Sequence, residues 1–140
     1  MPDLTTALLA LRPAVDAALS ETATPTVGDF LHRTLRPVLK LQNELLLLVV
    51  ADFVREHHIP FQAAGAAERE RVVAELVARN VKLRYTIIGI ISGMFTPAET
   101  AFYRQHRAEL NRRLLELASQ RVQSQVATVA EHVVSAGAAT

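Results

Sequence analysis

Five arginines in the second half of the chain are the side chains best suited to bind a ligand through charge. Each guanidinium can form two parallel hydrogen bonds with a phosphate or a carboxylate. The five are Arg84, Arg104, Arg107, Arg112 and Arg113. This pattern predicts an anion-binding face that a nucleic acid or a phosphate compound would recognise. The alternative is a solvated charged face, because acidic residues interrupt the run and few aromatic side chains are present to stack on bases.

Charge is unevenly distributed along the chain, although the net charge is only +1. Residues 79–121 contain eight basic and three acidic side chains, whereas residues 1–30 contain four acidic side chains and one basic side chain. Such asymmetry indicates either an anionic partner or two oppositely charged surfaces that meet within the fold or across a dimer. The sequence favours the second explanation.

His106 is the titratable residue whose position is most suggestive of a site. It lies four residues after Phe102 and four before Leu110, which places it on an apolar helical stripe. A buried imidazole needs a hydrogen-bond partner for each ring nitrogen, and Asp52 on a central helix is a candidate. We predict a core histidine with satisfied hydrogen bonds. The alternative is a pocket for an apolar or planar ligand with His106, Tyr85 and Asp52 as its polar groups.

Other catalytic and metal-binding patterns are missing from the sequence. The absence of cysteine excludes disulfides, thiolate metal sites and cysteine nucleophiles. Neither a Glu-x-x-His pair nor a His-Glu-x-x-His motif is present. Glu56, His57 and His58 are adjacent, so their side chains diverge on a helix instead of converging on an ion. The sequence predicts no metal site, no cofactor and no catalytic residue, and it favours a protein that is not an enzyme.

The candidate residues must be positioned by helices. The chain has 140 residues, half of them apolar, with only 5 glycines and 5% aromatic residues. Much of the apolar content is alanine, and alternating β-branched runs are rare, so helix is favoured over strand. We predict an all-α protein, a helical bundle of four to five helices forming a single domain over residues 1–136. Residues 137–140 are predicted to be a disordered tail.

Prolines and polar residues mark where the predicted helices begin and end. A first helix over residues 4–19 should break near Arg12, because Pro13 removes a hydrogen bond and clashes with the preceding turn. Residues 20–28 read as a loop, and either Thr26 or Asp29 caps the helix that follows. Further helices are predicted over residues 29–58, divided at Pro37, and over 66–79, 81–95 and 97–134, with a bend at Asn80.

The segment from Pro37 to His57 is the predicted centre of the bundle. Its middle, Leu45–Ala51, is apolar on every side of a helix. A helix that is apolar all round is expected to be buried all round. This run and Tyr85–Phe95 are the longest apolar stretches, and both are too short to cross a membrane.

Two glycines lie on one face of the helix predicted over residues 81–95. Gly89 and Gly93 are four residues apart. A glycine inside a helix costs about 1 kcal/mol of helix stability relative to alanine, so a pair on one face suggests that the two glycines have a structural role. The simplest reason is close packing of another helix, either within the chain or from a second subunit.

The last predicted helix begins with the clearest local signal in the chain. Thr96 caps the helix, Pro97 occupies its first position, and Glu99 completes a capping box. From there, apolar residues recur as far as Val134. A helix of that length would extend about 50 Å, which exceeds what one small domain can cover. Its C-terminal third should therefore pack on a second subunit, bend back, or fray.

Three functions are compatible with these patterns. The favoured one is a non-enzymatic helical bundle that self-associates as a dimer and acts by binding a partner, which could be a second copy or another protein. The second is a nucleic-acid or phosphate-binding accessory protein that uses the five arginines. The third is the binding of an apolar small molecule between helices. The lack of cysteine and of a signal peptide at the start of the sequence favours a cytoplasmic protein.

Overall fold

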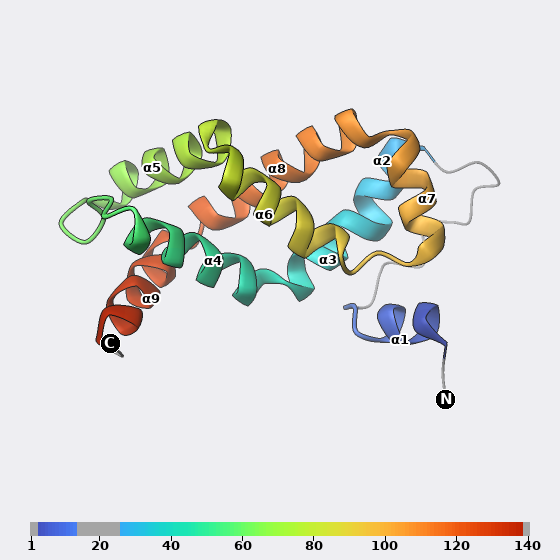
Figure 1. Ribbon diagram of the computed structural model, residues 1–140, viewed down its shortest axis with the longest axis horizontal. Helices are drawn as coiled ribbons and strands as arrows, with labels where there is room; N and C mark the ends of the chain where they lie inside the picture. Colours follow the sequence, from blue (N-terminus) through green and yellow to red (C-terminus); the bar gives the residue numbers. More distant parts are fainter. Residues whose placement is uncertain (1–2, 14–25, 139–140) are drawn as a thin grey trace.

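The computed structural model describes residues 3–13 and 26–138, and within these ranges the only regular elements are helices (Figure 1). The all-α fold predicted from the sequence is therefore confirmed. No described helix is both long enough and apolar enough to span a membrane. The elements are α1 (Leu4–Ala10), α2 (Val27–Phe30), the π-helical turn η1 (Leu31–Leu35), α3 (Arg36–Leu41), α4 (Asn43–Glu56), α5 (Ala66–Arg79), α6 (Val81–Ser92), α7 (Pro97–Gln105), α8 (Arg107–Gln123) and α9 (Val126–Ala138).

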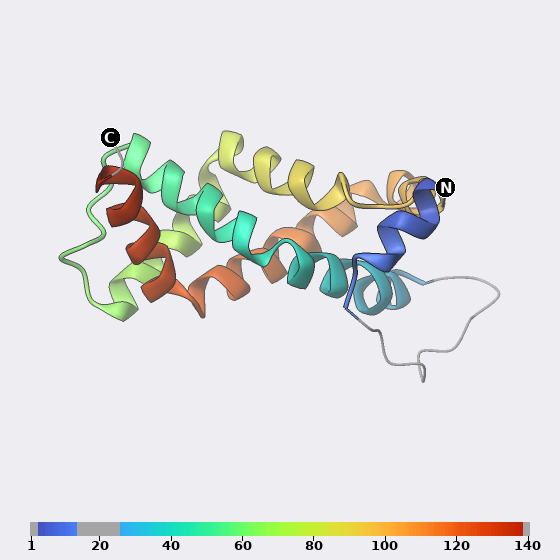
Figure 2. The ribbon, with the colours of Figure 1, turned by 90° about the horizontal axis from the view of Figure 1, so that it is seen from below.

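The helices form an elongated bundle in which α8 runs lengthwise and packs against α5 and α6 (Figures 1 and 2). Helix α4 packs against α6, α8 and α9, and α1 and α9 lie toward opposite ends of the molecule. Long side chains from these helices are almost completely buried and interdigitate in one apolar core. They include Leu46, Val50, Leu83, Ile87, Ile91, Leu110, Leu114 and Val129.

The N-terminal part of the chain agrees with the sequence where it is described. Helix α1 ends at Ala10, just before the predicted break at Arg12, and the predicted continuation over residues 14–19 lies outside the described residues, as do residues 20–25. Thr26 and Asp29 both take part in capping α2. The Thr26 hydroxyl accepts from the Asp29 amide at 3.1 Å, and the Asp29 carboxylate accepts from the Thr26 amide at 3.1 Å.

The division predicted at Pro37 was wrong in part: Pro37 lies in the first turn of α3, as expected, but the helical chain continues through it from η1. The turn before it is π-helical, and the Arg36 amide donates to the carbonyl of Leu31, five residues back. A proline ring clashes with the carbonyl four residues earlier in an ordinary α-helix, and a wider turn relieves that clash. The interruption comes instead at Gln42, whose side chain donates to the carbonyl of Ile90 at 3.2 Å.

The prediction that the central helix is buried all round was also wrong. Leu46 and Val50 of α4 are fully buried, but Leu45 and Leu48 are 41% and 42% exposed. Helices α6, α8 and α9 cover only part of the circumference of α4. The remaining side of α4 is open to solvent, and Leu45 and Leu48 lie on it.

The long C-terminal helix predicted over residues 97–134 is in fact three helices. It is interrupted at His106 and again at Ser124 and Gln125, and α9 turns back to pack on α4. Reciprocal amide hydrogen bonds between Asn43 and Gln125, of 2.9 and 2.8 Å, fix the second bend to the start of α4. The chain thus covers its own C-terminal stripe, and the length of this segment no longer argues for a dimer. Helix α9 extends to Ala138, two residues beyond the predicted domain end, and residues 139–140 of the predicted tail lie outside the described residues.

The predicted bend at Asn80 and the predicted capping box at Thr96 are confirmed. Asn80 ends α5 and its side chain accepts from the Leu83 amide at 3.0 Å, which starts α6. The Thr96 amide donates to Glu99 at 2.8 Å, and the Glu99 amide donates to the Thr96 hydroxyl at 3.2 Å. These short-range signals set the turns that place α6 and α8 side by side.

One buried ion pair fastens the N-terminal segment to the bundle. The Arg12 guanidinium donates to the two Glu99 oxygens at 2.6 and 2.5 Å and to the Met94 carbonyl at 3.0 Å, and its side chain is only 4% exposed. The Thr34 hydroxyl donates to the same carboxylate at 2.8 Å. Helix α1 itself has no buried residue. Among residues 3–13, Arg12 therefore provides the most deeply buried side chain that joins the segment to the bundle.

Burial would raise the pKa of Glu99, but the bonds that the carboxylate accepts have the opposite and larger effect. Hydrogen bonds from Arg12, from the Thr96 amide and from Thr34, together with the positive charge of Arg12, hold the pKa of Glu99 below its ordinary value. The pKa of this carboxyl is lower in the folded state than in the unfolded state, where it is about 4.3. Its contribution to stability is therefore complete at pH values above the unfolded pKa and is lost as the pH falls through the folded pKa.

The advantage of the wild type over Glu99→Gln is therefore expected to shrink on acidification. It should be constant from neutral pH down to about pH 5 and decline below that, as the wild-type carboxylate takes up its proton. Urea unfolding midpoints of both proteins, measured between neutral pH and about pH 3, test this. A stability difference that stays the same over the whole range would contradict it.

Candidate functional site

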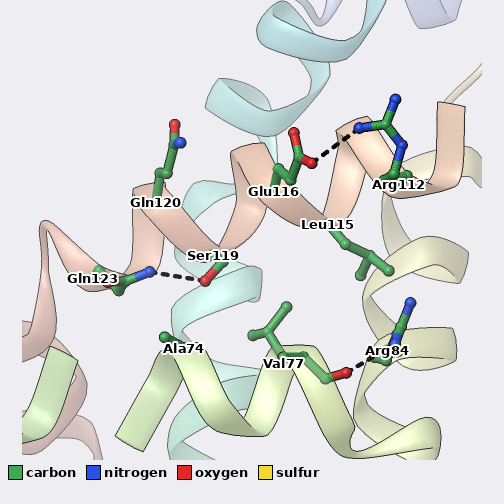
Figure 3. Close-up of a pocket in the computed structure, with 10 residues that line it drawn as sticks. Ala74, Val77, Arg84, Arg112, Leu115, Glu116, Ser119, Gln120 and Gln123 are labelled. Carbon is green, nitrogen blue, oxygen red and sulfur yellow. Dashed lines mark hydrogen bonds and ion pairs between the residues drawn. The ribbon is translucent and has the colours of Figure 1, made fainter. Parts of the chain in front are cut away.

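A hollow bordered by α5, α6 and α8 combines apolar surface with two of the five predicted arginines (Figure 3). Its volume is about 340 Å³, which is within the range of small-molecule sites. The lining residues are Ala74, Val77, Ala78, Arg84, Arg112, Leu115, Glu116, Ser119, Gln120 and Gln123.

Small side chains on the facing helices explain why this hollow exists. Ala74 and Ala78 are four residues apart, so they lie on one face of α5, and Ser119 faces Ala74 from α8. Val77 and Leu115, which are 4% and 6% exposed, close the base with apolar atoms. Larger residues at the alanine positions would fill the space between the helices.

A second hollow of about 320 Å³ lies beside the first along α6 and α8, and Arg84 and Leu115 line both. Its other lining residues are Val81, Tyr85, Ile88 and Asn111. Val81 and Tyr85 are 64% and 68% exposed, and because they are four residues apart they form an exposed apolar strip on α6. The two hollows together are called the arginine groove below.

The positive charge of the groove is only partly neutralised. The Arg84 guanidinium donates to the Ala78 carbonyl at 2.9 Å, and no carboxylate of the described residues pairs with it. Arg112 pairs with Glu116 at 3.2 Å, and both of these side chains are at least half exposed. Exposed pairs of this kind contribute little stability. At the opposite end of the first hollow the Gln123 amide donates to the Ser119 hydroxyl at 2.9 Å, so that end is polar and uncharged (Figure 3).

The other three predicted arginines do not line either hollow. Arg107 lies over the ring of Tyr103, with 5.7 Å from its guanidinium carbon to the ring centroid. Arg104 is exposed on α7, and Arg113 is exposed on α8, one residue and about 100° around the helix from Arg112. The five arginines are thus divided among different surfaces, and only Arg84 and Arg112 meet at one groove.

Asp52, Tyr85 and His106 are not brought together in a described hollow. Asp52 is exposed on α4, and Tyr85 lies on the arginine groove. His106 is half-buried at the junction of α7 and α8, where its ring packs on Phe102 with centroids 4.5 Å apart. The side chain of Tyr103 donates to Asn111 across this junction, which holds the bend that takes His106 off a continuous stripe.

Gly89 and Gly93 differ in their surroundings. A Cβ atom at Gly89 would meet nothing within 4 Å, so no helix of the described chain packs closely there. A Cβ at Gly93 would lie 2.9 Å from the carbonyl oxygen of Gly89. The need for glycine at position 93 is therefore local, whereas a second subunit at Gly89 remains a prediction.

Gly89→Ala is expected to stabilise the isolated chain by about 0.5–1 kcal/mol, because alanine restricts the unfolded state and fits without a clash. Gly93→Ala should destabilise it, because the backbone must shift away from the new methyl group. Thermal unfolding of the two variants tests the contrast. If Gly89→Ala lowered the melting temperature, close packing at this position would have to be considered again.

Sequence reasoning missed most of the groove, because its alanine, serine and glutamine residues carry no chemical signature. Among the described residues, no group of three or more acidic or histidine side chains is arranged to hold a metal ion. His57 instead stacks on Phe53 at 3.9 Å between ring centroids.

No protein-family model matches the chain, and neither the curated proteins nor the solved structures include one that matches it.

Proposed function

We propose that the protein is a non-enzymatic binding protein and that its ligand occupies the arginine groove. The observation that carries the proposal is the combination found there: a buried apolar base, exposed Val81 and Tyr85 at the rim, and the two guanidiniums of Arg84 and Arg112. Ligand sites are typically concave and apolar with a few polar groups that fix orientation. An amphipathic ligand could cover the apolar rim with its apolar part and bind the guanidiniums with its polar part.

Filling the groove should abolish binding without unfolding the protein. Ala78 is exposed on the groove side of α5, so Ala78→Trp places an indole into the hollow without entering the core. The matched control is Ala67→Trp, at an exposed position near the start of the same helix that lines neither hollow. The probe is 8-anilinonaphthalene-1-sulfonate, an apolar anion whose fluorescence rises when it leaves water.

We expect saturable binding of this probe to the wild type and to Ala67→Trp, with a loss of about tenfold or more in Ala78→Trp. Circular dichroism and melting temperature establish that both variants fold. Binding that does not saturate, or that is equal in the two tryptophan variants, would mean that the groove is not the site.

Self-association is a second candidate function, supported by a different observation. Several large apolar side chains outside the groove are exposed: Leu4, Leu9, Leu11, Leu45 and Leu48. Apolar surface of this kind is what a dimer interface would bury. Light scattering at micromolar concentration tests self-association, and a monomer mass would contradict it.

A nucleic-acid role has less support, because the arginines do not form one face. A cytoplasmic location remains a prediction from composition.

A further inference from the structure

We infer that the ligand of the arginine groove is a monoanionic carboxylate on an aliphatic chain, with its head group held by Arg84 and Arg112. This inference rests on the proposed function and adds the chemical class of the ligand. Three side chains in the lining carry charge, namely Arg84, Arg112 and Glu116. Their sum is +1, which a single negative charge would neutralise.

The Arg84 guanidinium can donate further hydrogen bonds to a ligand. It has five N–H donors, and its hydrogen bond to the carbonyl of Ala78 occupies only one of its nitrogens. The side chain is partly buried and lines both hollows. A carboxylate placed here would therefore form charge-assisted hydrogen bonds in a partly desolvated site, where such bonds are strong.

Arg112 can join the head group because its present partner is held weakly. The distance between Arg112 and Glu116 is 3.2 Å, and the side chains are 58% and 50% exposed. An exposed i,i+4 pair of this kind contributes little stability, so a ligand carboxylate can replace Glu116 at small cost. Glu116 then competes with the ligand, and removing its charge should increase affinity for an anion.

An aliphatic chain fits the rest of the groove better than a second charged group does. Beyond the arginines, the second hollow offers Val81, Tyr85 and Ile88, and no carboxylate or further cation. Burial of each methylene group of such a chain would strengthen binding by about fourfold. The chain would also cover the exposed side chains of Val81 and Tyr85.

Calorimetric titration with decanoate, decanol and acetate distinguishes the contribution of the charged head group to binding from that of the aliphatic chain of the ligand. Decanoate should bind at least about tenfold more tightly than decanol, as expected for hydrogen bonds to charged groups, and acetate should not bind measurably. Arg84→Gln and Arg112→Gln should reduce decanoate binding to the level of decanol, whereas Arg113→Gln, at the neighbouring exposed position, should not. Glu116→Gln should strengthen decanoate binding and leave decanol unchanged, with Glu109→Gln as its control.

Two results would overturn the inference while leaving the proposed function standing. One is equal binding of decanoate and decanol that Ala78→Trp abolishes, which would mean an uncharged ligand. The other is tighter binding of decyl phosphate than of decanoate, which would mean a more highly charged head group. If no probe bound in a manner sensitive to Ala78→Trp, the groove itself would not be the site.

Discussion

Replacing Glu99 with alanine is expected to lower the free energy of unfolding by about 3 kcal/mol. The substitution removes the partner of the buried Arg12 guanidinium and one half of the capping box at the start of α7. Loss of a buried ion-pair partner usually costs about 3–5 kcal/mol, because the other charge is left without compensation. Here the cost should be at the lower end, since Arg12 lies near the N-terminus and can move into water with its segment.

Glu109→Ala is the matched control, because Glu109 is exposed on α8 and has no ion-pair partner among the described residues. It should change stability by less than about 0.5 kcal/mol. Chemical denaturation of the two variants and of Arg12→Ala tests the prediction. The double variant Arg12→Ala/Glu99→Ala should show a coupling energy of about 1–3 kcal/mol. Strictly additive effects would mean that the two side chains do not stabilise the fold as a pair.

Leu46→Ala is expected to cost about 2–5 kcal/mol, whereas Leu48→Ala should cost well under half as much. The two leucines belong to the same apolar run in α4, yet Leu46 is fully buried and Leu48 is 42% exposed. Truncating a buried leucine loses transfer free energy and leaves a cavity, while truncating an exposed one does neither in full. Equal costs, measured by urea unfolding, would mean that the outer side of α4 is covered in solution.

If Leu48→Ala costs as much as Leu46→Ala only at high protein concentration, self-association through α4 would be the explanation. The same pair of variants therefore also bears on the second candidate function. Repeating the unfolding experiment at two protein concentrations distinguishes a covered surface within one chain from a surface covered by a second copy.

Local signals in the sequence predicted local structure well. The bend at Asn80, the cap at Thr96 and the break before Pro13 depend on side chains that bond to their own neighbouring backbone or on a missing amide, so a few residues determine them. The failures involve contacts between distant segments. The sequence could not distinguish Leu46 from Leu48, because that depends on which helices cover α4. The bend at Gln125 likewise depends on Asn43, 82 residues away.

The candidate site was predictable only as a list of charges. Arg84 and Arg112 were both identified, but the sequence did not distinguish them from Arg104, Arg107 and Arg113, because the distinction depends on the packing of α6 on α8. The buried pair of Arg12 and Glu99 was missed for the same reason, since 87 residues separate its members. Glu99 was recognised only in its capping role, which needs no distant partner.

The attachment of the N-terminal segment through Arg12 implies a sharp boundary for truncation. Deleting residues 1–10 would remove helix α1, which has no buried residue, so the bundle should retain nearly all of its stability. Deleting two residues more would remove the guanidinium and leave the Glu99 carboxylate partly enclosed without its counter-charge. The shortest fragment that folds like the whole chain should accordingly begin at Leu11 or Arg12.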